Sequence, residues 1–130
     1  MRLTAGHRRW LVDGSNLVGS RPDGWWRDRP AAFARLVAEL DAFARASGDE
    51  VTVVFDGGPL ALTDPPGVEV VIAPSADDRM VSRAGTDRDP SSLTAVTSDR
   101  ELARRLRTRG TAVVGAGTFR RLLDRGACRP

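Results

Sequence analysis

Residues 10–16 read Trp10-Leu11-Val12-Asp13-Gly14-Ser15-Asn16, an apolar run followed at once by small and polar residues. This pattern predicts a buried strand that delivers a carboxylate, a hydroxyl and an amide to one edge of a sheet. Three later apolar runs, over residues 51–55, 68–72 and 93–97, are also followed by acids: Asp56, then Asp77 and Asp78, then Asp99. If the strands are parallel, their carboxyl ends share one edge and the acids converge there.

Helical patterns separate the strands. Pro30 suits the first turn of a helix whose apolar residues recur at spacings of three and four up to Gly48, with Glu39 and Asp41 on or near its polar side. Shorter helices are expected in the segments capped by Ser75, Asp99 and Thr118, and a fifth strand over residues 111–114. This alternation predicts a three-layer α/β/α domain with a mostly parallel, five-stranded, Rossmann-like sheet.

The composition limits the class of protein. With 130 residues, 41% of them hydrophobic, the chain suits a single domain over residues 1–130. The net charge of +3 fits a polyanionic partner, or it reflects genomic base composition, since arginine supplies it and lysine is absent. Cys128 is the only cysteine, which excludes an internal disulfide and a cysteine zinc cluster. No apolar run reaches the roughly 18 residues of a membrane span, so a cytoplasmic protein is expected.

The acids at the predicted edge indicate a divalent metal site. Oxygen donors without histidine or cysteine suit Mg²⁺ or Mn²⁺, and beside a phosphodiester such a site can activate water and stabilise the leaving oxygen. Ser15, Asn16 and Ser98 would add neutral ligands or hydrogen bonds. A purely structural interpretation stays open, because acids are also favoured in the first turn of a helix and at its N-cap.

Aromatic and arginine side chains lie together after the first strand. Indole rings beside guanidinium groups can stack on bases and hold phosphates of single-stranded nucleic acid, or the indoles can cap the core. The helix after Asp99 carries an arginine-rich face, which is either solvated or bound to RNA. The residues predicted to contact RNA are Arg21, Trp25, Trp26, Arg27, Arg100 and Arg104.

Four segments, in this order and spacing, resemble the NYN domain family, in particular its YacP-like branch, within the PIN-like nuclease superfamily. They are residues 12–16 (VDGSN), 54–56 (VFD), 75–78 (SADD) and 97–101 (TSDRE). The resemblance covers about residues 10–124. It implies a PIN-like sheet with a central first strand and a metal-dependent endoribonuclease activity. In bacteria this activity is sometimes directed at mRNA or tRNA, and one branch is associated with the ribosome.

The resemblance assigns roles to residues at matching positions. Asp13 becomes the first metal-binding acid and Asn16 its polar partner, while Asp77 and Asp99 become the acids after the third and fourth strands. These three acids, Asp13, Asp77 and Asp99, form the implied catalytic set. Glu101 stands near a further acid that is more commonly aspartate, and Asp78 is an alternative to its neighbour. The implied metal ligands are therefore Asp13, Asp56, Asp77, Asp78, Asp99 and Glu101.

Rival classes of α/β protein lack the residues they need. A phosphorelay receiver requires a lysine after the last strand, and a haloacid-dehalogenase-type phosphatase requires an acid where Ser15 stands. The spacing of Gly14 and Gly19 does not match a dinucleotide-binding loop. One alternative remains beside the nuclease, a catalytically weak PIN-like domain that binds RNA or a protein partner.

Overall fold

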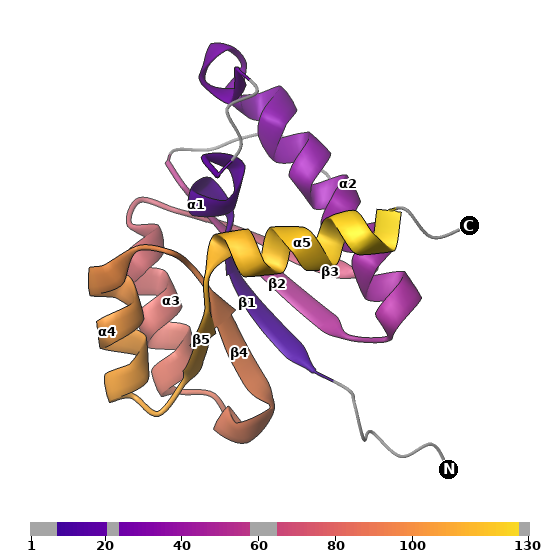
Figure 1. The fold of residues 1–130 in the computed structure, drawn as a ribbon. Coiled ribbons are helices and arrows are strands. Elements are labelled where there is room, and N and C mark those ends of the chain that lie inside the picture. Colours follow the sequence, from indigo (N-terminus) through magenta and orange to yellow (C-terminus); the bar gives the residue numbers. More distant parts are fainter. Residues whose placement is uncertain (1–7, 21–23, 58–64, 128–130) are drawn as a thin grey trace.

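A single parallel sheet organises the chain. The computed structural model describes residues 8–20, 24–57 and 65–127. The strands are β1 (Arg9–Asp13), β2 (Glu50–Asp56), β3 (Val68–Ala73), β4 (Leu93–Val96) and β5 (Ala112–Val114), and they lie in the order β3-β2-β1-β4-β5 (Figure 1). All four neighbouring pairs are parallel. The predicted five-stranded α/β sheet is thereby confirmed, with the first strand at its centre.

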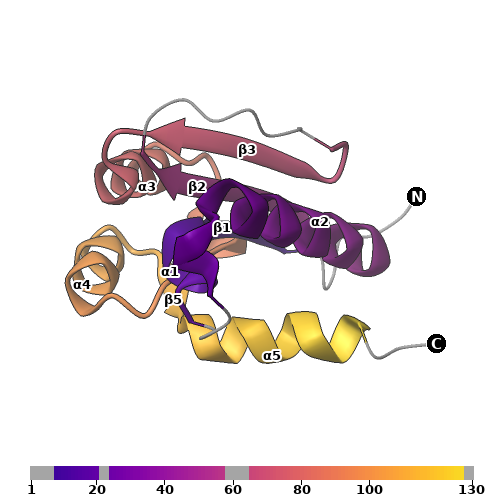
Figure 2. The same cartoon turned by 90° about the horizontal axis from the view of Figure 1, so that it is seen from above.

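Helices cover both faces of the sheet. The elements outside the sheet are α1 (Gly14–Val18), η1 (Trp25–Arg27), α2 (Arg29–Ser47), α3 (Ala76–Gly85), η2 (Pro90–Ser92), α4 (Arg100–Thr108) and α5 (Ala116–Ala127). The core residues of α1, α2 and α5 pack on one face, and those of α3 and α4 pack on the other (Figure 2). Within the described ranges, none of these helices combines the length and the apolar character needed to cross a bilayer.

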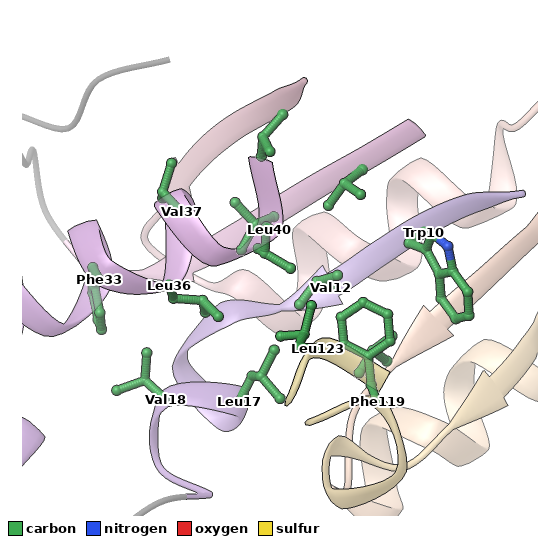
Figure 3. Packing of buried hydrophobic residues seen from close by; sticks show 14 of the residues in the cluster. Trp10, Val12, Leu17, Val18, Phe33, Leu36, Val37, Leu40, Phe119 and Leu123 are labelled. Atoms are coloured by element: carbon green, nitrogen blue, oxygen red, sulfur yellow. The ribbon is translucent and has the colours of Figure 1, made fainter. Parts of the chain in front are cut away.

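β1 is buried on both faces because helices cover both sides of the sheet. Alternate side chains of the strand point in opposite directions, so each face of β1 meets a different layer of helices. Trp10 and Val12 pack in the larger core cluster, between α2 and α5, where the rings of Trp10 and Phe119 lie 4.9 Å apart (Figure 3). Leu11 points the other way and joins Met80 of α3 and Leu102 of α4. The central strand therefore contributes side chains to both halves of the core.

The predicted helix boundaries agree with the structure at three of their four signals. Gly48 ends α2 with a φ of 79°, while Ser75 and Asp99 cap α3 and α4 through hydrogen bonds from the third following amide. The cap assigned to Thr118 was wrong, because α5 begins two residues earlier at Ala116. At that position the Ala116 N–H donates to Ser98 Oγ, so the strand-end loop of β4 sets where α5 starts.

Asp41 was also placed wrongly. The side chain is buried, with 5% of its surface exposed, although it was expected on or near the polar side of α2. It forms an ion pair with Arg45 one turn later and accepts a hydrogen bond from the Gly67 N–H at 3.0 Å. A buried carboxylate with these donors is satisfied, and here it anchors the segment that leads into β3.

The segment after β1 folds as a short helix, α1. α1 begins directly after Asp13, whose Oδ1 accepts from the Asn16 N–H and so caps the helix. Gly14 makes this turn possible. A Cβ at Gly14 would lie 2.5 Å from Cε1 of Phe55 and 2.8 Å from Cγ2 of Val53. The backbone of α1 therefore packs directly on β2.

Replacing Gly14 by alanine is expected to destabilise the protein by about 1–3 kcal/mol, because the added methyl group has no space against Phe55 and Val53. Gly117→Ala in α5 is the matched control, since a Cβ there meets nothing within 4 Å. The control should change the free energy of unfolding by about 1 kcal/mol or less, toward greater stability. Urea denaturation of both variants measures the difference, and equal stabilities would refute the tight packing of α1 on β2.

Candidate acidic site at the carboxyl edge of the sheet

The candidate site lies where the strand order reverses. β2 adjoins β1 on one side and β4 adjoins it on the other, so connections leave this point toward opposite faces of the sheet. In open α/β sheets such a point forms a crevice at the carboxyl ends of the strands. Asp13 ends β1 here, and Thr97, Ser98 and Asp99 follow β4.

Asp13 is the buried acid of this edge, with 5% of its surface exposed. Its Oδ2 accepts a hydrogen bond from Thr97 Oγ1 at 2.9 Å, and its Oδ1 accepts from the Asn16 N–H at 3.3 Å. The pKa of Asp13 is raised to about 6, chiefly by burial and also by the charges of Asp77 and Asp99, against the lowering effect of the two hydrogen bonds. Asp13 is therefore held in place and electrostatically coupled to two other acids.

Asp77 and Asp99 complete this group from two different helices. Asp77 is half-buried in the first turn of α3, and its pKa is raised by burial and by the charge of Asp99. Asp99 is exposed, caps α4 through Oδ1, and donates its own N–H to Thr97 Oγ1 at 3.1 Å. We refer to Asp13, Asp77 and Asp99 as the acidic group. The structure brings together the three acids that the resemblance implied as catalytic.

The other acids have different surroundings. Asp56 ends β2, where its Oδ1 accepts from the Ala76 N–H at 3.0 Å, and its charge raises the pKa of Asp77. Asp78 is exposed and pairs with Arg105 of α4 at 2.9 Å, which holds the pKa of Asp78 below its usual value. Glu101 is exposed and pairs with Arg104 on its own helix. The structure thus places Asp56 beside the acidic group, while Asp78 and Glu101 are held in surface ion pairs.

The three neutral residues predicted beside the acids connect the loops of this edge. Ser15 Oγ accepts from the Asp56 N–H at 3.1 Å, and Asn16 Oδ1 accepts from the Ser98 N–H at 2.8 Å. Ser98 Oγ accepts from the Ala116 N–H, also at 2.8 Å. These bonds join the ends of β1, β2, β4 and β5, so the residues fix the frame that holds the acids.

Sequence reasoning missed Thr97 as a site residue, although a signal was available. The register pairs Val12 with Val96, which places Thr97 beside Asp13 at the next position of the parallel pair. A threonine at that point can donate to a buried carboxylate. Arg105 was missed for another reason, because its partner Asp78 lies 27 residues earlier in the sequence, on a different helix.

The predicted RNA-binding residues fall into separate groups. Arg21 lies outside the described residues. Trp25 packs against the core, as one interpretation of the tryptophan pair predicts, whereas Trp26 is 55% exposed and its role in stacking stays a prediction. Arg27 places its guanidinium carbon 5.8 Å from the Trp26 ring centroid. Arg100 and Arg104 are exposed on α4, where Arg104 pairs with Glu101.

The donor chemistry of the acidic group fits a hard divalent cation. All its side-chain donors are carboxylate oxygens, and their mutual repulsion raises the pKa values of Asp13 and Asp77, which a cation would relieve. In the arrangement described, however, no three Asp, Glu, His or Cys side chains of residues 8–20, 24–57 and 65–127 form a group that could hold a metal ion. Metal binding would therefore require carboxylate side chains to turn toward one another.

These features define a class, a three-layer α/β domain with a parallel sheet of order β3-β2-β1-β4-β5 and an acidic group at its carboxyl edge. No family model matches the chain, and no curated protein does. Two crystal structures of Rae1 (YacP) from Bacillus subtilis resemble the structure of this chain. The first, of a point mutant, shares 24% sequence identity at a TM-score of 0.77, and the match covers 92% of this chain and 76% of that one. The second structure shares 22% sequence identity with this chain at a TM-score of 0.77, and the match covers 91% of this chain and 74% of that one. The chain therefore has a YacP-like fold.

The raised pKa of Asp13 gives a pH-dependent stability with a defined sign. The folded state binds the proton of Asp13 more tightly than the unfolded state does. The contribution of this proton to the free energy of unfolding is therefore fully present below about pH 4 and is lost as the pH rises through 6. In EDTA, the wild type should lose about 2 kcal/mol relative to Asp13→Asn between pH 4 and pH 7. Denaturation of both proteins across this range measures the difference. A constant difference would show that Asp13 has an ordinary pKa.

Proposed function

We propose that this protein is a metal-dependent endoribonuclease of the PIN-like superfamily, in the YacP-like branch of the NYN domain family. The observation that carries the proposal is the burial of Asp13 at the switch point of the sheet, in one electrostatic group with Asp77 and Asp99. The YacP-like fold supports it, and the acids implied by the resemblance lie at the carboxyl ends of the parallel strands or at the start of the helices that follow.

The cation proposed for this site is Mg²⁺ or Mn²⁺, held by Asp13, Asp77 and Asp99 with support from Asp56. Bound there, the ion would supply a Lewis acid at the phosphodiester and favour ionisation of an attacking water. The protein contributes a fixed carboxylate at Asp13, held by Thr97 and by the Asn16 N–H. The half-buried Asp77 carboxylate lies within reach of the charges of Asp99 and Arg105, and it would have to turn toward Asp13 to share a cation.

The chain also supplies charge for the RNA backbone beside the acids. Arg100 is exposed at the first position of α4, directly after Asp99. A guanidinium in this place can pair with a phosphate next to the scissile bond and offset the repulsion between RNA and the carboxylates. The choice of mRNA or tRNA as substrate, an association with the ribosome and a cytoplasmic location are further proposals that rest on the family resemblance alone.

A second candidate function is an RNA- or protein-binding module with little or no catalysis. One observation favours it: Asp13, Asp56, Asp78, Asp99 and Glu101 each already make a hydrogen bond or ion pair within the protein. Acids engaged in this way can serve the fold without a metal. The two functions differ in whether the acidic group binds a cation and cleaves RNA.

Cleavage of labelled RNA by the wild type is expected with Mn²⁺ or Mg²⁺ and not with EDTA. Asp13→Asn and Asp99→Asn should each lower the rate by roughly a hundredfold or more, because each removes charge from the cation site. Asn is a good N-cap, so both variants should fold, although Asp13→Asn keeps only one of the two oxygens that accept hydrogen bonds from Asn16 and Thr97. Circular dichroism and thermal denaturation check this.

Thermal denaturation with added Mn²⁺ separates the two candidate functions. A cation that binds only the folded state raises the melting temperature, and Asp13→Asn should abolish that rise. If the wild type binds RNA but shows neither cleavage nor stabilisation by Mn²⁺, the binding module is correct. A wild type that cleaves equally well in EDTA would refute the metal-dependent mechanism.

The adjacent acids of α3 should differ in their effects. Asp77→Asn is expected to reduce cleavage to the same extent as Asp13→Asn, because Asp77 belongs to the acidic group. Asp78→Asn is the matched control, with the same chemical change one residue away, and it should retain cleavage within a few-fold because Asp78 pairs with Arg105 on the surface. Initial rates at saturating Mn²⁺ measure both, and the opposite ranking would assign the metal to Asp78.

A further inference from the structure

Trp26 stands out on the surface of the described chain. Among the residues that the structure describes, it is the large apolar side chain that remains exposed, at 55%. An exposed indole is unusual because burying such a ring contributes strongly to folding. Its neighbour Trp25 does pack against the core cluster, so the exposure of Trp26 is not a property of the whole segment.

The turn that carries Trp26 is held in one conformation. Gly24 has a φ of 82°, which the turn requires, and the Arg27 N–H donates to the Gly24 carbonyl at 3.0 Å. The Asp28 N–H donates to the Trp25 carbonyl, and Asp28 Oδ1 accepts from the Ala31 N–H to cap α2. The Trp25 ring meets Trp26 edge to face at 6.0 Å. The indole is therefore displayed on a fixed support.

One arginine lies directly beside the exposed ring. Arg27 places its guanidinium carbon 5.8 Å from the ring centroid, whereas the exposed Arg29 places its own 5.4 Å from the Phe33 ring centroid. The intervening acid, Asp28, is engaged in the cap of α2. An aromatic surface with a guanidinium group beside it matches a nucleotide, whose base can stack on the ring and whose phosphate can pair with arginine.

The element that carries Trp26 lies at the same end of the molecule as the carboxyl end of β1. In Figure 1 η1, the short segment before α2, lies on the side of the sheet toward which β1 points, beyond α1. Asp13 ends β1 on that side, and Arg100 begins α4 next to Asp99. An RNA strand that crosses the acidic group would thus meet arginines of α4 on one flank and the Trp26 turn on the other.

We propose that Trp26 is a stacking site for an unpaired base of the RNA, which makes this protein selective for single-stranded over double-stranded RNA. The inference deepens the proposed function and rests on RNA being the substrate. Selectivity follows because a base inside a duplex is already stacked on its neighbours and has no free face for the indole. Phosphate contacts by arginine do not distinguish the two forms in this way.

The test measures binding in the Asp13→Asn background, where cleavage is not expected. Fluorescence anisotropy of a labelled single strand of about ten nucleotides is compared with that of the same strand annealed to its complement. Trp26→Ala should weaken binding of the single strand roughly tenfold and leave duplex binding nearly unchanged. Trp26→Phe should restore most of the affinity, since it retains an aromatic ring. Arg100→Ala is the control for charge and should weaken both forms alike.

The outcomes separate this inference from the proposed function. Equal losses for single-stranded and duplex RNA with Trp26→Ala, or no loss at all, would overturn the stacking site. Cleavage by Trp26→Ala at the wild-type kcat/KM on a single strand would also overturn it while leaving the nuclease intact. If the wild type never cleaves but Trp26→Ala still lowers single-strand affinity selectively, the stacking site stands and the nuclease fails.

Discussion

The hydrogen bond from Thr97 to Asp13 is the interaction on which the carboxyl edge depends. A carboxylate buried to this degree needs donors, and the parallel register of β1 and β4 places the Thr97 hydroxyl beside it. The same hydroxyl accepts from the Asp99 N–H and so fixes the start of α4. One side chain thereby sets the position of two of the three acids. The third, Asp77, comes from α3, which follows the outer strand β3.

Structural roles and proposed functional roles coincide in these residues. Asp13 caps α1, Asp99 caps α4, and the Ser15 hydroxyl joins the end of β2 to the edge. The acidic group therefore does not depend on flexible loops, because each of its carboxylates lies within one turn of a helix or strand end. Such positions give a binding site the precision that loops lack. An interpretation of the acids as helix caps is correct and does not compete with a role in metal binding.

The sequence allowed the sheet to be predicted because its information is local. Apolar runs of three to five residues followed by polar clusters marked the strands, and spacings of three and four marked α2. The features that were missed depend on partners distant in sequence. Asp41 is buried because the Gly67 N–H reaches it, and Asp78 faces Arg105 because α3 and α4 pack together. The packing of α1 likewise depends on residues distant in sequence, because Gly14 permits its close approach to Val53 and Phe55 of β2.

The acidity of the edge has a cost for the fold, and this cost bears on function. Asp13 and Asp77 carry raised pKa values because burial and mutual repulsion disfavour their charged forms. Asparagine at either position would remove the repulsion, but at position 13 its single amide oxygen could accept only one of the two hydrogen bonds that Oδ1 and Oδ2 accept. Hydrogen bonding therefore explains a carboxylate at position 13, but it does not explain the presence of further acids that repel it. Clustered groups with perturbed pKa values in a crevice are typical of functional sites, and a cation is the ligand that would turn their repulsion into attraction.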